Sequence, residues 1–180
     1  CYEVSDRDGA HKMRAAVREN EALVKTACSD PMQAGMMGMH AAFTLSDATL
    51  DYCRAHTPDG TGFHIHVAEG LDDVKLSLKE HGTRIVNRLW AAGILGPQTI
   101  AAHCIHVDGR EMDLLAESGT MVVHNPESNM GNAVGCEPMK QLFDRGILLG
   151  LGTDGYTHDM LESYKVGNLI HKHNLQDPNA

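Results

Sequence analysis

Apolar residues gather in five short segments, separated by stretches in which they recur at helical spacing. The segments are residues 36–44, 63–69, 99–106, 120–129 and 147–155. The last four are continuous apolar runs that end in polar residues, and such runs are typical of strands covered on both faces. Strands that alternate with helices, in units of about thirty residues, form parallel sheets. The pattern therefore predicts an α/β fold built on a parallel sheet.

Start and stop signals bound the helices expected between these strands. Asp108 and Glu111 have the spacing of a capping box, and Thr83 is expected to cap another helix. In the helix that begins near residue 138, Leu142 and Phe143 are both expected to face inward. Helices are predicted over residues 13–27, 46–55, 71–82, 83–93, 108–119 and 138–146.

The length of the chain limits the architecture that it can form. With 180 residues it can bury a substantial core as one domain, residues 1–180. A complete eight-stranded β/α barrel takes about 250 residues, so the chain is short of one. Because it also begins at Cys1 rather than Met, we interpret it as a fragment of a longer protein.

Charge and cysteine content argue against several classes of partner. The formal net charge is −9 and no basic cluster occurs, which argues against binding to nucleic acid or an anionic membrane. No apolar run approaches the roughly 20 residues that cross a bilayer, and no signal peptide is evident. The five cysteines are scattered, which favours reduced thiols in a cytoplasmic protein.

Polar side chains suited to metal or proton chemistry follow the predicted strands. Because the carboxyl ends of parallel strands meet at one edge, these side chains are expected to form a shared site. Taken singly, each histidine is more typical of a structural role, and Ser128 and Asn129 are expected to bond backbone groups in a rigid turn. Asp154 is different, because it lies between glycines that allow close approach. The set comprises His64, His66, Glu69, His103, His106, His124 and Asp154.

Four ordered motifs resemble those of the amidohydrolase superfamily: HVAE, AAHCIH, HNPESNM and LGTDG. The resemblance is closest to the subgroup of cytosine, guanine and adenosylhomocysteine deaminases and chlorohydrolases. The segments SDRDG (residues 5–9) and GMHAAFTLSD (residues 38–47) resemble aminohydrolases of poorly defined substrate. The resemblance implies the C-terminal part, about strands 3 to 8, of a TIM-like (β/α)8 barrel that is incomplete in this chain.

The resemblance also implies a role for individual residues. His66 matches a metal-binding histidine, and Asp154 matches an aspartate that binds metal and takes a proton from the attacking water. Glu69 matches the carboxylate that shuttles a proton to the substrate ring, and His103 matches a histidine that contacts water and substrate. His40 matches a residue that faces the substrate. No direct role is assigned to His64, His106 or His124, although His124 begins a motif that lines the site in the family.

The chain differs from the family in the number of metal ligands that it contains. In the family, the first strand ends in an H-x-H motif that supplies two further metal ligands. This chain has no counterpart of that first-strand motif, so of the four expected ligands only His66 and Asp154 are present. Because zinc sites need three or four ligands, the fragment by itself is expected to be inactive. Residues 35–43 contain no lysine to bridge two metals, so the resemblance implies one divalent metal, zinc or alternatively iron.

The predicted reaction is hydrolytic deamination of an amino-substituted heterocycle such as a purine, pterin or pyrimidine. The partner is then a small molecule, and relatives suggest a homo-oligomer. Three alternatives stay open: release of chloride or another leaving group at the same site, a non-catalytic barrel that only binds, and an inert truncated product.

Overall fold

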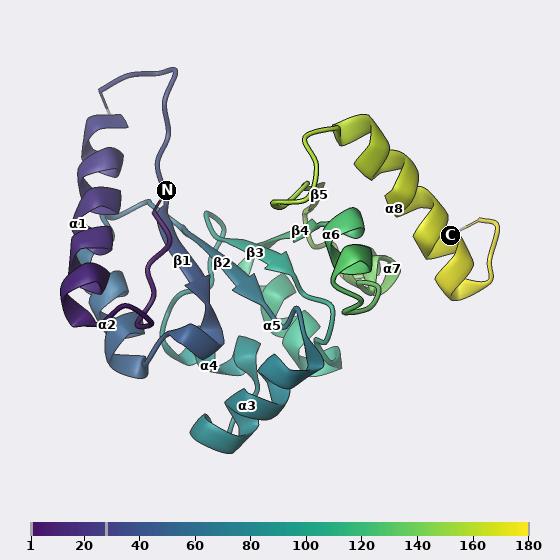
Figure 1. Ribbon diagram of the computed structural model, residues 1–180, viewed down its shortest axis with the longest axis horizontal. Helices are drawn as coiled ribbons and strands as arrows, with labels where there is room; N and C mark the ends of the chain where they lie inside the picture. Colours follow the sequence, from purple (N-terminus) through teal and green to yellow (C-terminus); the bar gives the residue numbers. More distant parts are fainter. Residues whose placement is uncertain (1, 28, 180) are drawn as a thin grey trace.

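A five-stranded parallel sheet forms the centre of the protein (Figure 1). The computed structural model describes residues 2–27 and 29–179. The strands follow one another in the order β1-β2-β3-β4-β5, so each pairs with its sequence neighbour. They are β1 (Met37–Ala41), β2 (Phe63–Val67), β3 (Ile100–His103), β4 (Met121–His124) and β5 (Leu149–Leu151).

The first of the six strands expected from the resemblance is reduced to a single contact. Val4 forms only an isolated parallel bridge with Met39 of β1. The pairing of β1 with β2 is also irregular, because Gly38 is opposite His64 whereas Ala41 is opposite His66. One extra residue in β1 therefore makes a bulge between Gly38 and Ala41.

Helices connect the strands and cover the sheet. In Figure 1, α1 and α2 lie beside β1, α3, α4 and α5 lie below the sheet, and α8 lies at the opposite end near β5. The helices are α1 (Ala10–Ala27), the 3-10 helix η1 (Ala42–Thr44), α2 (Asp47–His56), α3 (Leu71–His81), α4 (Ile85–Ala91), α5 (Gly109–Ser118), α6 (Pro126–Gly131), α7 (Met139–Asp144) and α8 (Met160–Leu175).

Several expected helix ends are present, and one is not. Asp108 accepts a hydrogen bond from the Glu111 amide, and Gly119 ends the same helix in the left-handed conformation. Thr83, however, does not cap α4, which begins after Arg84. The Glu111 carboxylate explains the difference, because it accepts the Val86 N–H at 2.9 Å and so replaces a local cap with one from α5.

The predicted orientation of Phe143 is wrong. Leu142 is fully buried, but Phe143 is 71% exposed. Neighbouring residues on a helix point in different directions, and the short helix α7 presents only one face to the core. In α7 that face carries Leu142 and not Phe143.

The two faces of the sheet differ in cover, which the continuous apolar pattern did not predict. In β2, Phe63, Ile65 and Val67 are buried, whereas His64 and His66 are only half-buried. The helices pack against the first face, where Leu50, Leu89 and Leu115 contribute to the core. The second face carries the histidines.

Two further features bear on the class of protein. No helix in the described part of the chain is long and apolar enough to cross a membrane. Cys53, Cys104 and Cys136 are free thiols, while Cys1 and Cys28 lie outside the described residues.

Candidate active site

The carboxyl ends of three strands bring four of the predicted residues together. His66 is in β2, Glu69 follows it, His103 ends β3, and Asp154 follows β5. The Nε2 atom of His103 lies 3.7 Å from Glu69 Oε2 and 3.7 Å from Asp154 Oδ2. The rings of His66 and His103 stack with centroids 5.6 Å apart. Two imidazoles and two carboxylates therefore share one cluster.

The bulge in β1 fixes the ring of His66. Its Nδ1–H donates to the backbone carbonyl of His40, which leaves the Nε2 lone pair of His66 free to bind a ligand. The His40 ring lies beside it, 5.4 Å between centroids, and its Nδ1 is 3.0 Å from Thr44 Oγ1. Burial lowers the pKa of His40, and the Arg7 guanidinium lowers it further. His40 is therefore a neutral neighbour of the cluster.

Asp154 is held as a carboxylate. Burial alone would raise its pKa, but hydrogen bonds from Ser128 and Gly155, with His103 and His66 nearby, bring the net pKa below its usual value. The Ser128 hydroxyl donates to Oδ2 at 2.6 Å, and the Gly155 N–H donates to Oδ1 at 2.7 Å. Asp154 can therefore bind a cation or accept a proton.

His103 has one satisfied and one unsatisfied ring nitrogen. Its side chain is fully buried, and Nδ1 lies 2.8 Å from Asn129 Oδ1. The Nε2 atom is also buried but has no hydrogen-bond partner among the described residues. Such atoms are uncommon in folded proteins, and this one faces Glu69 and Asp154, where a bound ligand would meet it.

The backbone is strained where these residues lie. Ala68, His103 and Asp154 have φ values of 47°, 74° and 54°, in the left-handed region that L-residues rarely adopt. Each follows or ends a strand of the cluster. Strained residues concentrate at functional sites, where the surrounding structure holds them.

Helix α6 contributes residues to the cluster for which the sequence analysis expected other roles. Ser128 and Asn129 do not bond backbone groups in a rigid turn, because Pro126 begins a helix instead. Their side chains contact Asp154 and His103, and one turn later Asn132 donates to Glu69 Oε1 at 3.2 Å. Proline in the first turn of a helix, followed by polar residues at i and i+4 spacing, is the signal that could have shown this.

Comparison with known proteins agrees with this geometry. The model of the amidohydrolase family matches residues 2–180. The chain belongs to the amidohydrolase family. Its five-stranded sheet is accordingly part of a TIM-like barrel, as the sequence predicts.

Similar proteins are named as deaminases. The 5'-deoxyadenosine deaminase of Methanopyrus kandleri is 42% identical over 149 residues, which are 80% of this chain and 35% of the relative. The 5-methylthioadenosine/S-adenosylhomocysteine deaminase of Pelotomaculum thermopropionicum is 35% identical over 174 residues, 93% of this chain and 40% of the relative. This amidohydrolase chain thus spans about two fifths of the length of its curated relatives.

A solved structure has the same fold. The adenosine deaminase from Xanthomonas campestris, determined with bound zinc, superposes with a TM-score of 0.84 at 27% identity. The match covers 96% of this chain and 40% of that one.

The three histidines without an assigned role lie outside the cluster of carboxylates. His64 is half-buried, with its ring centroid 6.3 Å from that of His66, and burial lowers its pKa. His106 donates from Nε2 to the carbonyl of Val134 at 2.8 Å. His124 is buried and its ring contacts Glu137 and His171. His124 therefore lies behind the cluster rather than lining it.

His66 and Asp154 fit one side of a metal site. The free Nε2 lone pair and the ionised carboxylate are the nitrogen and oxygen donors that zinc accepts. Within residues 2–27 and 29–179, however, no group of three or more His, Cys, Asp or Glu side chains is arranged to hold a metal ion. The two donors suit the metal chemically but do not make a complete site.

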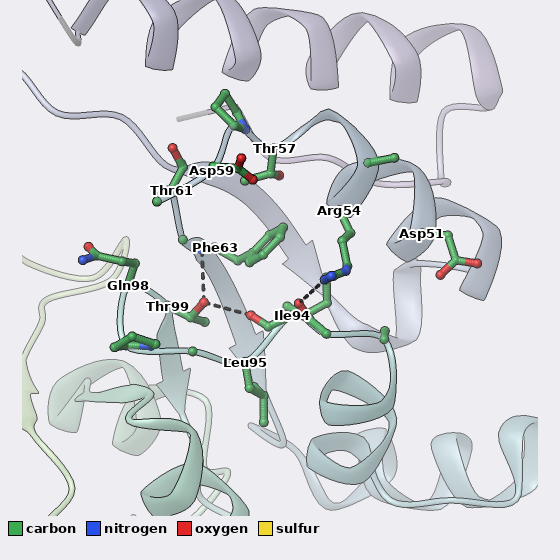
Figure 2. Close-up of a pocket in the computed structure, with 18 of the residues that line it drawn as sticks. Asp51, Arg54, Thr57, Asp59, Thr61, Phe63, Ile94, Leu95, Gln98 and Thr99 are labelled. Carbon is green, nitrogen blue, oxygen red and sulfur yellow. Dashed lines mark hydrogen bonds between the residues drawn. The ribbon is translucent and has the colours of Figure 1, made fainter.

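A large cavity lies at the other end of the strands (Figure 2). Its volume is about 710 Å³, and loops preceding β2 and β3 line it. Thr99 accepts a hydrogen bond from the Phe63 N–H and donates to the Ile94 carbonyl, while Arg54 donates to Gly93. None of the predicted site residues lines this cavity. In β/α barrels the amino ends of the strands usually contribute to stability rather than to catalysis. The size of this cavity therefore does not identify it as the active site.

Proposed function

We propose that the protein containing this chain is a metal-dependent hydrolytic deaminase of an amino-substituted heterocycle. The observation that carries the proposal is the buried Nε2 of His103, which faces the carboxylates of Glu69 and Asp154. Hydrolysis of a ring C–N bond needs groups that accept and deliver protons around one carbon, and these three side chains supply them. A protein that only binds has no need of such a set.

An adenosine-type purine is the first substrate to test. The two relatives are named for 5'-deoxyadenosine and for 5-methylthioadenosine and S-adenosylhomocysteine, all of which carry a 6-aminopurine. Pterins and pyrimidines remain in the proposed class, because the cluster acts on the amidine-like carbon that all these rings share.

His66 and Asp154 would hold one divalent metal, zinc in preference to iron, together with ligands from beyond the described residues. Zinc is preferred because the Xanthomonas campestris structure contains it. Such an ion lowers the pKa of a bound water towards about 7 and so supplies a nucleophile at neutral pH.

The side chains of this chain accept and deliver the protons of the reaction. Asp154, ionised and oriented by Ser128 and Gly155, accepts a proton from the attacking water. Glu69, oriented by Asn132, delivers a proton to the ring nitrogen, so that negative charge does not accumulate there. His103 hydrogen-bonds the attacking water from its buried position. As the tetrahedral intermediate collapses to a ring carbonyl, its hydroxyl group returns a proton to Glu69, and the proton held by Asp154 passes to the amino group, which leaves as ammonia.

The test is ammonia release by the complete, zinc-loaded protein on a panel of aminopurine nucleosides, aminopterins and aminopyrimidines, with a chloro-substituted analogue included. We expect release from at least one amino compound and a loss of at least about a hundredfold in Asp154→Asn. Asp59→Asn, at the opposite end of the strands, is the matched control and should keep full activity. Release of chloride alone, or of nothing while zinc is bound and the fold intact, would refute deamination.

Composition, packing and cysteine content support further proposed properties. The buried apolar residues form one cluster, which supports a single unit over residues 1–180. The net charge of −9 supports a small-molecule partner rather than nucleic acid or a membrane. The free thiols of Cys53, Cys104 and Cys136 support a cytoplasmic location. Homo-oligomerisation is also proposed, and light scattering of the complete protein would test it.

A further inference from the structure

A second cluster of polar side chains lies behind His103, on the side away from the carboxylates. We call it the His124 cluster: His124, Asn129, Cys136, Glu137 and His171. His124, Asn129 and Glu137 are each 1% exposed, while Cys136 and His171 are half-buried. The proposed reaction uses none of them. Burying so many polar groups is costly unless they are paired, so the arrangement requires an explanation.

Asn129 connects this cluster to the candidate active site. Its Oδ1 lies 2.8 Å from His103 Nδ1, and its Nδ2 lies 3.5 Å from His124 Nδ1. His124 Nδ1 is also 3.0 Å from Glu137 Oε2. One side-chain amide thus touches an imidazole on each side.

The direction of the amide determines the tautomer of His103. An amide oxygen only accepts and an amide nitrogen only donates. With Oδ1 towards His103, Nδ1 of that ring must carry a proton, and the neutral ring then presents its Nε2 lone pair to Glu69 and Asp154. With the amide reversed, the proton of His103 would be on Nε2 instead. The reversed amide would also require a proton on His124 Nδ1.

The protonation of His124 and Glu137 decides between the two directions. Burial lowers the pKa of His124 to about 4 and raises the pKa of Glu137 well above its usual value. Both shifts favour the neutral forms, in which the Glu137 hydroxyl donates to His124 Nδ1. Glu137 Oε1, which is buried without a partner among the described residues, also favours the neutral acid, because a carboxylate would leave charge unpaired there.

The remaining contacts of the cluster agree with this assignment. With Nδ1 of His124 accepting, its Nε2–H donates to His171 Nε2 at 3.2 Å. His171 Nδ1–H then donates towards Cys136 Sγ at 3.6 Å, and the Cys136 thiol donates towards the Glu137 carbonyl at 3.7 Å. Every ring nitrogen of the two histidines is satisfied without a charge. The single lone pair on His124 Nδ1 accepts from the Glu137 hydroxyl at 3.0 Å, and the amide N–H of Asn129, 3.5 Å away, lies on the same acceptor side of the ring.

We propose that Asn129 is a positioning residue that holds His103 as the Nδ1–H tautomer, and that the hydrogen-bonded His124–Glu137 pair fixes the direction of the Asn129 amide. His103 then accepts a hydrogen bond at Nε2 and does not donate one. The centre of the site has three acceptors, which select ligands with N–H or O–H donors, such as an attacking water or a ring amino group. The catalytic consequence rests on the proposed function, whereas the tautomer does not.

The test is the nitrogen-15 spectrum of the histidine rings in the complete, zinc-loaded protein at neutral pH. His103→Gln assigns the resonances of His103. We expect a protonated Nδ1 and an unprotonated Nε2 in the wild type, and a mixture of tautomers in Asn129→Leu. A wild-type spectrum with the proton on Nε2, or an unchanged spectrum in Asn129→Leu, would overturn the proposal. Both readings are independent of whether ammonia is released.

Two near-isosteric variants separate positioning from packing. Asn129→Asp keeps an acceptor for His103 and should keep the Nδ1–H signal. In Glu137→Gln, the amide can still donate to His124 Nδ1, so the Nδ1–H signal of His103 should persist, and its loss would contradict a donor at Glu137. If the deaminase assignment holds, Asn129→Leu lowers kcat roughly 10- to 100-fold with KM little changed, and Asn129→Asp retains more of kcat. Equal losses in Asn129→Leu and Asn129→Asp would indicate a packing role and contradict the proposal.

Discussion

The two ends of the sheet show how differently chemistry and cavity volume are distributed. At the carboxyl ends, His66, Glu69, His103 and Asp154 converge around a buried nitrogen with no partner in the described residues. At the amino ends, a cavity of about 710 Å³ is lined by loops whose hydrogen bonds tie the backbone together. This cavity is thus remote from the reactive groups. Strained backbone and convergent titratable groups identify a candidate site better than volume does.

The largest expected effect is the loss of the proton-delivering carboxylate at the carboxyl ends. Glu69→Gln keeps the contact with Asn132 but cannot transfer a proton, so we expect kcat for deamination to fall about 10²- to 10⁴-fold with little change in KM. Steady-state ammonia release by the complete protein measures it. Glu80→Gln, an exposed position in α3, serves as the control. A Glu69→Gln enzyme that retains wild-type kcat would contradict the proposal that the chemistry takes place at the carboxyl ends of the strands and not at the amino ends.

Acid should destabilise the side of the protein that contains the His124 cluster. The pKa of His124 is about 4 when folded, against an ordinary 6.5. Between these values the unfolded chain binds more protons at this residue, so His124 alone lowers stability by up to about 3 kcal/mol as the pH falls. The raised pKa of Glu137 opposes this loss, because the folded chain binds more protons at Glu137, so the measured slope is the difference between the two. Urea unfolding of the complete protein across this range measures the slope. His124→Gln should flatten the slope, and an unaltered slope in that variant would show that other groups cause the acid sensitivity.

At the amino ends, Gly62→Ala should affect stability but not chemistry. A Cβ at Gly62 would meet the backbone oxygen of Gln98 at 1.8 Å, so the loops must move apart. We expect a loss of about 1 to 3 kcal/mol in the free energy of unfolding, with kcat unchanged for the folded protein. Gly96→Ala is the matched control in the same cavity, because its Cβ would meet nothing within 4 Å. A comparable drop in both variants would argue against steric contact as the cause.

The smallest effect is expected for the charged wall of the large cavity. Arg54 donates to the Gly93 carbonyl at 3.3 Å from an exposed position. Arg54→Gln should change the free energy of unfolding by less than about 0.5 kcal/mol and leave kcat unchanged. Thermal unfolding and ammonia release provide the two readouts. A marked rise in KM would mean that substrate contacts this end of the sheet after all.

Local signals were enough to predict most elements of the fold. The strand at residues 63–67 and the helix capped by Asp108 are present because apolar runs and capping residues act over short distances. The start of α4 and the exposure of Phe143 could not be predicted in this way. The first depends on Glu111 from a different helix, and the second depends on which side of α7 meets the core.

The candidate site likewise contains residues that the sequence predicted and residues that it did not. His66, Glu69, His103 and Asp154 follow apolar runs, so the expectation that parallel strand ends meet was sufficient to group them. Ser128 and Asn129 belong to the short helix α6 and Asn132 follows its last residue. The orientation of this helix depends on tertiary packing, and the contacts of the three residues lie 26 to 63 residues away in the sequence. Roles for these residues remain predictions until the variants are measured.

The bulge in β1 makes the site sensitive to chain length as well as to residue identity. The extra residue between Gly38 and Ala41 allows the His40 carbonyl to meet the ring of His66. Removal of one residue from this strand would restore a regular ladder and move the His40 carbonyl away from the His66 ring. The sequence would still contain every reactive residue. A sequence alignment that checks only whether the site residues are present would therefore accept such a deletion variant, although its site residues would no longer be positioned correctly.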